Sequence, residues 1–271
     1  MEKKNNSIKI LLGFLLIIVA LATALPFVLM FLVSLTQKTD LSIRFNPAEF
    51  SLKNYITIFS GSKIGRYLLN STIVVICTCV LNVLICAFAA YPFAKKRFRG
   101  KEQLFFVYLA TMMIPGQATM IPVFLIIKSM GLMNTYIALS IPFLNAFGVF
   151  LIRQFLQGLP DELLEAARID GCTDLQLFFR IVIPLIKPVL ISLTIFTFIS
   201  CWNDYLWALI LTTEEGMQTM TVALATLKAN YTVNYGLVMA GATVTFLPPF
   251  IMYLLFQKQF VEGIALSGVK G

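Results

Sequence analysis

Long charge-free segments are the feature that most limits how this chain can fold. Five of them lie between Lys9 and Lys38, Arg66 and Lys95, Glu102 and Lys128, Lys128 and Arg153, and Lys228 and Lys258. Each exceeds the ~20 apolar residues that a helix needs to cross a bilayer. A sixth apolar segment lies between Lys187 and Lys228, interrupted by Asp204 before the polar residues 212–215.

Only helices and closed barrels satisfy their backbone groups in lipid, and these segments are continuously apolar instead of alternating. We therefore expect an all-α fold, a polytopic membrane bundle forming one domain over residues 1–271. The expected spans lie near residues 10–35, 68–94, 104–127, 135–156, 186–211 and 236–257.

The composition agrees with a membrane protein and argues against an enzyme. The chain is 59% hydrophobic and 13% charged, whereas soluble domains are nearer one half and one quarter. It has no histidine, which removes the commonest general base and metal ligand. GxSxG, HExxH and GxxxxGK[ST] are also absent from the sequence, and the five cysteines lack metal-ligand spacing. We predict no catalytic residue, no metal site and no cofactor in this chain.

The basic residues predict the orientation of the chain. An even number of spans places both termini on one side, together with residues 95–103 and 157–187. That side holds 14 of the 21 Lys and Arg residues, so it is expected to be cytoplasmic. The basic segment, residues 95–101, is interpreted as an orientation signal and a contact for anionic lipid, not as a nucleic-acid site. The first apolar segment is too long for a signal peptide and is expected to be a retained anchor.

One amphipathic stretch, residues 158–188, stands out from the apolar sequence; we call it the acidic loop. Pro160 suits the first turn of a helix, and Asp161 and Glu162 suit its positive end. The apolar stripe of this helix is expected to contain Leu163, Leu164, Ala166, Ala167 and Ile169. Asp170-Gly171 is expected to end the helix, with glycine in the left-handed cap position.

A second short helix is expected to follow within the acidic loop. Thr173 and Gln176 fit a capping box, and Leu175, Phe178 and Val182 are expected to pack beneath the bundle. A juxtamembrane helix on lipid would favour basic residues, whereas this stretch is acidic. We therefore expect it to meet a basic protein groove.

A family resemblance rests on the same stretch. Glu165-Ala166-Ala167, Gly171, Ile181, Ile183 and Pro184 follow the spacing of the EAA loop of ABC importer permeases. Ile183 stands in place of the commoner Leu, and Cys172 in place of the commoner Ala. Segments 70–75, 90–101, 113–136, 150–171 and 202–212 and the C-terminal tail resemble the carbohydrate-uptake class, similar to the maltose and glycerol-phosphate permeases. The resemblance covers nearly the whole chain and implies a type I, MetI-like permease fold.

The resemblance implies partners and roles for named residues. It implies a bacterial cytoplasmic membrane location, a second permease subunit in a heterodimer, an ATPase dimer that carries ATP and Mg²⁺, and an extracytoplasmic solute-binding protein. The ATPase-coupling residues that it implies are Glu162, Glu165, Ala166, Ala167, Asp170, Gly171 and Pro184. The outer loop 212–235 is implied to face the binding protein, through Thr213, Gly216, Met217 and Gln218. The cytoplasmic tail 258–271 resembles one that contacts the ATPase in some relatives.

Polar residues within the spans are candidates for the solute pathway, because such residues are costly in lipid and usually face a wet cavity or the bundle interior. The candidates are Asp204, Asn203, Asn82, Gln117 and Asn145. For Asp204, a structural hydrogen bond near the outer interface is the alternative.

Three other functions remain open at this point. A permease for amino acids or peptides shares the EAA loop. A self-sufficient secondary transporter usually shows internal repeats, and none is evident here. A membrane enzyme acting on lipid or glycan would need clustered acids or histidines, whereas the acids cluster in the acidic loop. The solute class expected from the resemblance is an oligosaccharide, a sugar, a polyol or glycerol phosphate.

Overall fold

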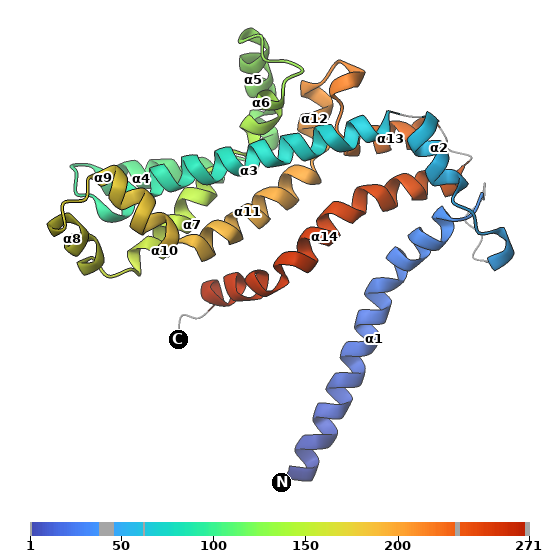
Figure 1. Ribbon diagram of the computed structural model, residues 1–271, viewed down its shortest axis with the longest axis horizontal. Coiled ribbons are helices and arrows are strands. Elements are labelled where there is room, and N and C mark those ends of the chain that lie inside the picture. Colours follow the sequence, from blue (N-terminus) through green and yellow to red (C-terminus); the bar gives the residue numbers. More distant parts are fainter. Residues whose placement is uncertain (1, 38–45, 62, 231–233, 269–271) are drawn as a thin grey trace. The chain divides into compact units, whose positions relative to one another are not determined.

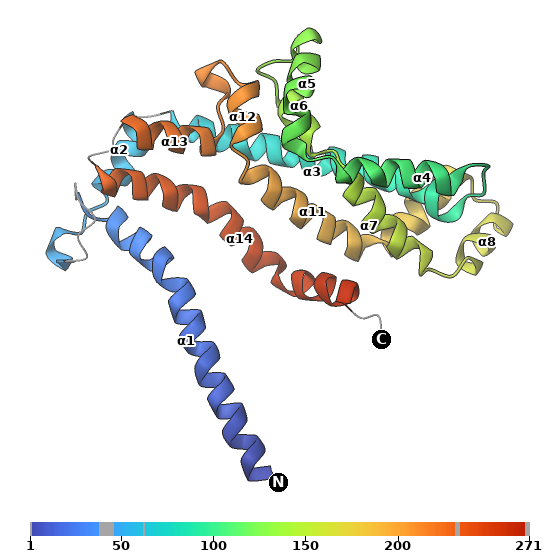
Figure 2. The same cartoon turned by 180° about the vertical axis from the view of Figure 1, so that it is seen from behind.

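All regular structure in the described residues is helical, as expected. The computed structural model describes residues 2–37, 46–61, 63–230 and 234–268 (Figures 1 and 2). The three long helices are α1 (Glu2–Ser34), α3 (Ile64–Lys95) and α14 (Tyr235–Gly268).

The shorter elements are η1 (Pro47–Glu49), α2 (Lys53–Gly61), α4 (Lys101–Ala110), η2 (Thr111–Met113), α5 (Gly116–Ser129), α6 (Tyr136–Ser140), η3 (Ile141–Phe143), α7 (Ala146–Gln157), α8 (Glu162–Ile169), α9 (Asp174–Leu177), the π-helical η4 (Phe178–Val182), α10 (Ile183–Leu185), α11 (Lys187–Trp202), α12 (Leu206–Leu211), η5 (Glu215–Met217) and α13 (Met220–Asn230).

Three helical segments are long and apolar enough to cross a membrane: Leu11–Ser34, Ile64–Lys95 and Tyr235–Gln259. Three further pairs of helices meet this requirement together but bend by 100°, 56° and 75° where they join. Counting each bent pair as one span gives up to six. The structure therefore differs from the unbroken helices expected over 104–127, 135–156 and 186–211.

Local sequence explains the first of these breaks. Ile114 and Pro115 both adopt extended backbone angles between η2 and α5, because proline disfavours the helical conformation of the residue before it. Leu144 and Asn145 are extended in the same way between η3 and α7. The helix expected to run to residue 211 ends at Trp202, and α12 begins only at Leu206.

The chain forms two compact units. The first contains residues 1–65 and 223–247. Within it the Asn54 amide caps the end of α1, donating to the carbonyls of Ser34 at 2.8 Å and Thr36 at 2.7 Å. Gly236, at the start of α14, lies against the same Thr36 carbonyl. The end of α1, the Asn54 amide and Gly236 are therefore in direct contact.

The second unit contains residues 66–222 and 248–271 and is built along α3. One apolar core packs the C-terminal half of α3 against α4, α7, α8, η4 and α11. Another packs its N-terminal half against α5, α6, α12 and the end of α11. Helix α3 therefore presents two ends, each with its own set of neighbours (Figures 1 and 2).

Candidate functional site

Local signals build the acidic loop as the sequence predicts. Gly171 has a φ of +83° and ends α8 in the left-handed conformation, and the N–H of Cys172 donates to the Ala167 carbonyl at 3.0 Å. The capping box is confirmed, because Thr173 Oγ1 accepts from the Gln176 N–H and Gln176 Oε1 accepts from the Thr173 N–H. Pro160 differs from the expectation: it precedes the N-cap Asp161 instead of lying in the first turn.

The two faces of α8 differ sharply in burial. Leu164 and Ala167 are buried in the core that α3 organises, whereas Glu162, Glu165, Ala166 and Ile169 are exposed. We call these four residues the exposed face of α8. Ile169 has 87% of its surface exposed, which is high for a large apolar residue.

This arrangement corrects two expectations. Ala167, which was expected at the ATPase contact, is 5% exposed and packs inside its own chain. The expected apolar stripe is not buried as a whole, because Leu163, Ala166 and Ile169 are exposed. The helical period alone would have assigned the buried and the exposed residues of α8 to different faces, because residues three or four positions apart share one face of a helix.

The second half of the acidic loop anchors it. Leu177, Phe178 and Val182 are buried, and the Phe178 ring lies 4.6 Å from that of Phe88 on α3. Leu175 differs from the expectation and is 65% exposed, since Leu177 takes the buried position. Pro184 follows in the exposed part of α10.

Two adjacent lysines at the end of α3 contact the acidic loop. Lys95 Nζ lies 2.6 Å from Asp161 Oδ1 and donates to the Leu159 carbonyl, also at 2.6 Å. Lys96 Nζ pairs with Asp174 Oδ1. The hydrogen bonds and charges of these lysines hold the pKa of each carboxyl below its usual value. A lowered carboxyl pKa favours the ionised form that each ion pair requires.

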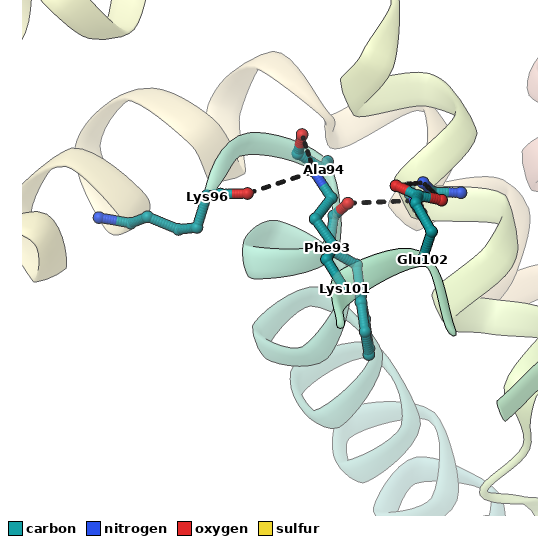
Figure 3. Close-up of polar contacts among 6 residues, drawn as sticks. Phe93, Ala94, Lys96, Lys101 and Glu102 are labelled. Atoms are coloured by element: carbon teal, nitrogen blue, oxygen red, sulfur yellow. Dashed lines mark hydrogen bonds and ion pairs between the residues drawn. The ribbon is translucent and has the colours of Figure 1, made fainter. Parts of the chain in front are cut away.

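A second set of contacts fixes the end of α3 itself (Figure 3). Lys101 Nζ donates to the carbonyls of Ala94 at 3.3 Å and Lys96 at 3.2 Å. The buried Arg153 donates from Nε to the Phe93 carbonyl at 3.1 Å and from Nη2 to both carboxylate oxygens of Glu102 at 2.8 Å. Lys101 and Arg153 thus donate to carbonyls at the C-terminal end of α3, where their positive charges interact favourably with the helix dipole.

The opposite end of α3 holds residues 212–219, which we call the 212–219 loop. Asn70 Nδ2 donates to the carbonyls of Gly216 at 2.9 Å and Gln218 at 3.0 Å, and Arg66 Nε donates to Gly216 at 2.9 Å. Tyr67 donates to Glu215 Oε1 at 3.0 Å. Three groups of this loop, the carbonyls of Gly216 and Gln218 and the Glu215 carboxylate, are therefore bound to the first turns of α3.

Asn134 orders the other arm of the 212–219 loop. It has a left-handed φ of +57°, which Asn tolerates better than most residues. Its Oδ1 accepts from the N–H groups of Thr213 at 2.7 Å and Glu214 at 3.1 Å, and its Nδ2 donates to Thr213 Oγ1 at 2.9 Å. Sequence reasoning missed Asn134, because no local pattern links residues so far apart.

The acidic loop and the 212–219 loop lie at the two ends of one helix. With a rise of 1.5 Å per residue, α3 is about 48 Å long, compared with about 30 Å for the hydrocarbon core of a bilayer. A membrane crossed by α3 therefore has the acidic loop on one side and the 212–219 loop on the other.

Comparison with known proteins identifies the family. Residues 82–265, which include the whole acidic loop and the 212–219 loop, match the family of binding-protein-dependent transport system inner membrane components. The chain belongs to this family. It is accordingly a non-catalytic transport subunit, a multi-pass permease of the cytoplasmic membrane.

The permease is similar over most of its length to named sugar transporters. It is 35% identical to the arabinooligosaccharides transport system permease protein AraQ of Halalkalibacterium halodurans, over 93% of each chain. It is 33% identical to the melibiose/raffinose/stachyose import permease protein MelC of Bacillus subtilis, over 94% of each. It is 32% identical to the lactose transport system permease protein LacG of Rhizobium radiobacter, over 93% of this chain and 92% of the relative.

The fold of the permease is also that of a solved transporter. A chain of a bacterial ABC transporter involved in the import of the acidic polysaccharide alginate superposes with a TM-score of 0.85, at 28% identity and over 95% of this chain and 98% of that one. The ABC importer permease fold expected from the acidic loop is confirmed.

The pathway candidates of the permease fall into two groups. Gln117, Asn145 and Asn203 are exposed and lie beside the breaks that precede α5, α7 and α12. Asp204 follows Asn203, and its carboxylate accepts from the Ala208 N–H at 3.1 Å, the structural hydrogen bond that was the alternative. Asn82 is buried and joins α3 to α11 by donating to Thr197 Oγ1 at 2.9 Å, so its amide is already paired within the chain.

Proposed function

We propose that this permease is one transmembrane subunit of an ATP-driven, binding-protein-dependent importer of a carbohydrate. The observation that carries the proposal is the similarity over more than nine-tenths of the chain to permeases named for arabinooligosaccharides, melibiose/raffinose/stachyose and lactose. Because these names refer to oligosaccharides, an oligosaccharide is the first solute that we propose. A sugar, a polyol and glycerol phosphate belong to the same proposal.

The acidic loop is proposed to couple the permease to an ATPase dimer that binds ATP and Mg²⁺. The exposed face of α8 supports this role, because it combines two carboxylates with the exposed apolar side chain of Ile169. Such a surface suits a groove that has a basic residue for Glu165 and an apolar pocket for Ile169. Closure of the ATPase then displaces α8 as a rigid element, and the chain carries the displacement to α7 and α11.

The 212–219 loop is proposed to face the solute-binding protein, on the side opposite the ATPase. The position of the loop at the far end of α3 supports this proposal. Hydrogen bonds with Arg66, Asn70 and Asn134 hold the loop in one conformation there. Both termini are proposed to be cytoplasmic, on the side of the acidic loop. The last residues of the proposed ATPase-contacting tail, 269–271, lie outside the described residues.

The solute pathway is proposed to pass beside the helix breaks, together with a second permease subunit. Irregular backbone at membrane depth is tolerated where protein buries it or where it lines a water-filled cavity. Gln117, Asn145 and Asn203 are exposed beside such breaks, and their amides can donate to and accept from sugar hydroxyls. Asp204 is included in this proposal because it follows Asn203 at the same break, although its carboxylate already accepts from the Ala208 N–H. Asn82 is assigned to packing.

Reconstitution tests the function directly. Proteoliposomes that contain this permease, its partner permease and the ATPase should accumulate a radiolabelled oligosaccharide when the binding protein and ATP are supplied. Vesicles without ATPase should accumulate none, because the proposed energy source is ATP hydrolysis on that subunit. Unlabelled amino acids and peptides should not compete with the labelled solute.

Two outcomes would contradict the proposal. Uptake by the permease alone, driven by an ion gradient, would make it a secondary transporter. Competition by an amino acid or peptide, with none by any carbohydrate, would assign it to another class of ABC permease.

The 212–219 loop should loosen when Asn134 is replaced by Ala. The substitution removes the acceptor of two N–H groups, and we expect amide exchange at residues 213–214 to accelerate about tenfold. Hydrogen exchange with mass spectrometry of the permease in detergent measures this. Asn134→Gly is the matched control, because it keeps the left-handed backbone accessible and removes only the side chain. Exchange unchanged in both variants would show that the loop is ordered by other contacts.

A further inference from the structure

The basic segment lies against the acidic loop, although α3 and α8 are far apart in the sequence. Lys95 is separated from Asp161 by 66 residues, and Lys96 from Asp174 by 78. Asp161 is the N-cap of α8, and Asp174 is the first residue of α9. Two consecutive lysines therefore hold the acidic loop at one point before α8 and at one point after it.

The burial of the lysines shows that their charges are committed to these contacts. The Lys95 side chain is 5% exposed and the Lys96 side chain 33% exposed. A buried ammonium group has lost most of its water, so loss of its partner leaves an uncompensated charge. The carboxylates of Asp161 and Asp174 remain largely exposed, so these acids tolerate substitution better than Lys95.

The end of α3 is a firm attachment point. Its last carbonyls are bound by Lys101 and Arg153, and the Arg153 guanidinium lies 3.9 Å from the centroid of the Phe105 ring on α4. Figure 3 shows the Lys96 side chain extending away from Lys101 and Glu102. The Nζ of Lys96 pairs with Asp174. The turn that carries both lysines is thus fixed to α4 and α7 while its ammonium groups reach the acidic loop.

We infer that Lys95 and Lys96 are positioning residues that tether the acidic loop to α3 through Asp161 and Asp174. A displacement of α8 then moves α3 as well as α7 and α11. Since α3 runs to the 212–219 loop, the tether joins the proposed ATPase contact to the opposite end of the permease through one continuous helix. The identity of the partner that displaces α8 depends on the proposed function, whereas the tether does not.

The expectation from sequence, a lipid contact for the whole basic segment, is revised accordingly. Lys95, Lys96 and Lys101 are bound to protein acceptors. Arg97 and Arg99 are exposed and remain available to anionic lipid. The two kinds of residue can therefore be separated by substitution.

Charge reversal and charge swap test the tether in the full transporter. Lys96→Glu and Asp174→Lys should each lower uptake per ATP hydrolysed about tenfold, the upper range for residues in a coupling network. The double variant Lys96→Glu/Asp174→Lys should recover to within about threefold of the unmodified protein, because the ion pair is rebuilt in reverse. The pair Lys95 and Asp161 should follow the same pattern, with Asp161→Asn as the milder variant if Lys95→Glu does not fold.

The ratio of uptake to ATP hydrolysis distinguishes positioning from folding, since a misfolded permease lowers both together. Arg99→Glu is the matched control: it makes the same change of charge in the same segment, and Arg99 takes part in none of the ion pairs given above. Its coupling ratio should stay within about twofold of the unmodified protein, as for surface charges that make no specific pair.

A second measurement does not depend on transport. Amide exchange over residues 162–177 in the assembled transporter should accelerate about tenfold in Lys96→Glu and return in the double variant. Unchanged exchange and coupling in every single variant would overturn the inference. Equal losses in Arg99→Glu and Lys96→Glu, with no recovery on swapping, would also overturn it and assign the segment to lipid. Failure of the unmodified transporter to move any carbohydrate would instead contradict only the proposed function.

Discussion

Glu165→Lys should lower solute uptake by the assembled transporter about 100-fold, the effect expected when one member of a buried intermolecular charge pair is reversed. Glu165 lies on the exposed face of α8, and α8 packs on its own chain through Leu164 and Ala167. The substitution therefore changes the surface offered to the ATPase without disturbing the core. Uptake into proteoliposomes measures the effect.

Co-purification of the ATPase and the second permease provides the control for assembly, and it should be largely preserved. Glu165→Gln, which removes the charge without reversing it, should give an intermediate loss. Ile169→Asp tests the apolar part of the same face and should lower uptake as well. Full uptake by Glu165→Lys would show that the exposed face of α8 does not meet a basic groove.

Gly236→Ala should destabilise the first unit strongly. A Cβ at this position would lie 1.9 Å from the Thr36 carbonyl oxygen and 2.8 Å from Asn54 Nδ2. Because the nearest atom belongs to the backbone, it cannot move aside as a side chain would, and we expect a loss of about 3 kcal/mol. Thermal unfolding in detergent and the yield of folded protein measure it.

Gly241→Ala is the matched control in the same helix. Its Cβ would lie 3.1 Å from Leu224 Cδ1, which is the far end of a flexible side chain and can shift. We expect a change of less than about 1 kcal/mol for Gly241→Ala. Equal stability of the two variants would contradict the close approach of α14 to the end of α1.

The acidic loop shows how far local sequence predicts structure. Gly171, Thr173 and Gln176 act on their nearest neighbours along the chain, and the structure places each in the predicted cap. The helical period could also have placed Ala167 and Ile169 on different faces of α8, but it could not say which face is buried. That period had to be applied to the direction of the core, which only packing defines.

The tethers could not be predicted in this way. Each ion pair joins residues more than 60 positions apart, and a run of lysines beside a membrane helix has the same sequence whether it meets lipid or carboxylates. The same holds for Asn134, whose hydrogen bonds close a loop 79 residues further along the chain. Asn82 gave a polar signal that did not reveal its partner on α11.

The sequence by itself determined the class of the protein, because the cost of exposing backbone groups to lipid acts on every long apolar segment wherever it lies in the fold. It also determined the acidic loop, whose caps depend on residues three or four positions apart. Only the tertiary structure decided which face of α8 is exposed, where the apolar segments break, and which acids the lysines of α3 bind. Those outcomes depend on distances between segments remote in the chain, and such distances exist only after the helices have packed.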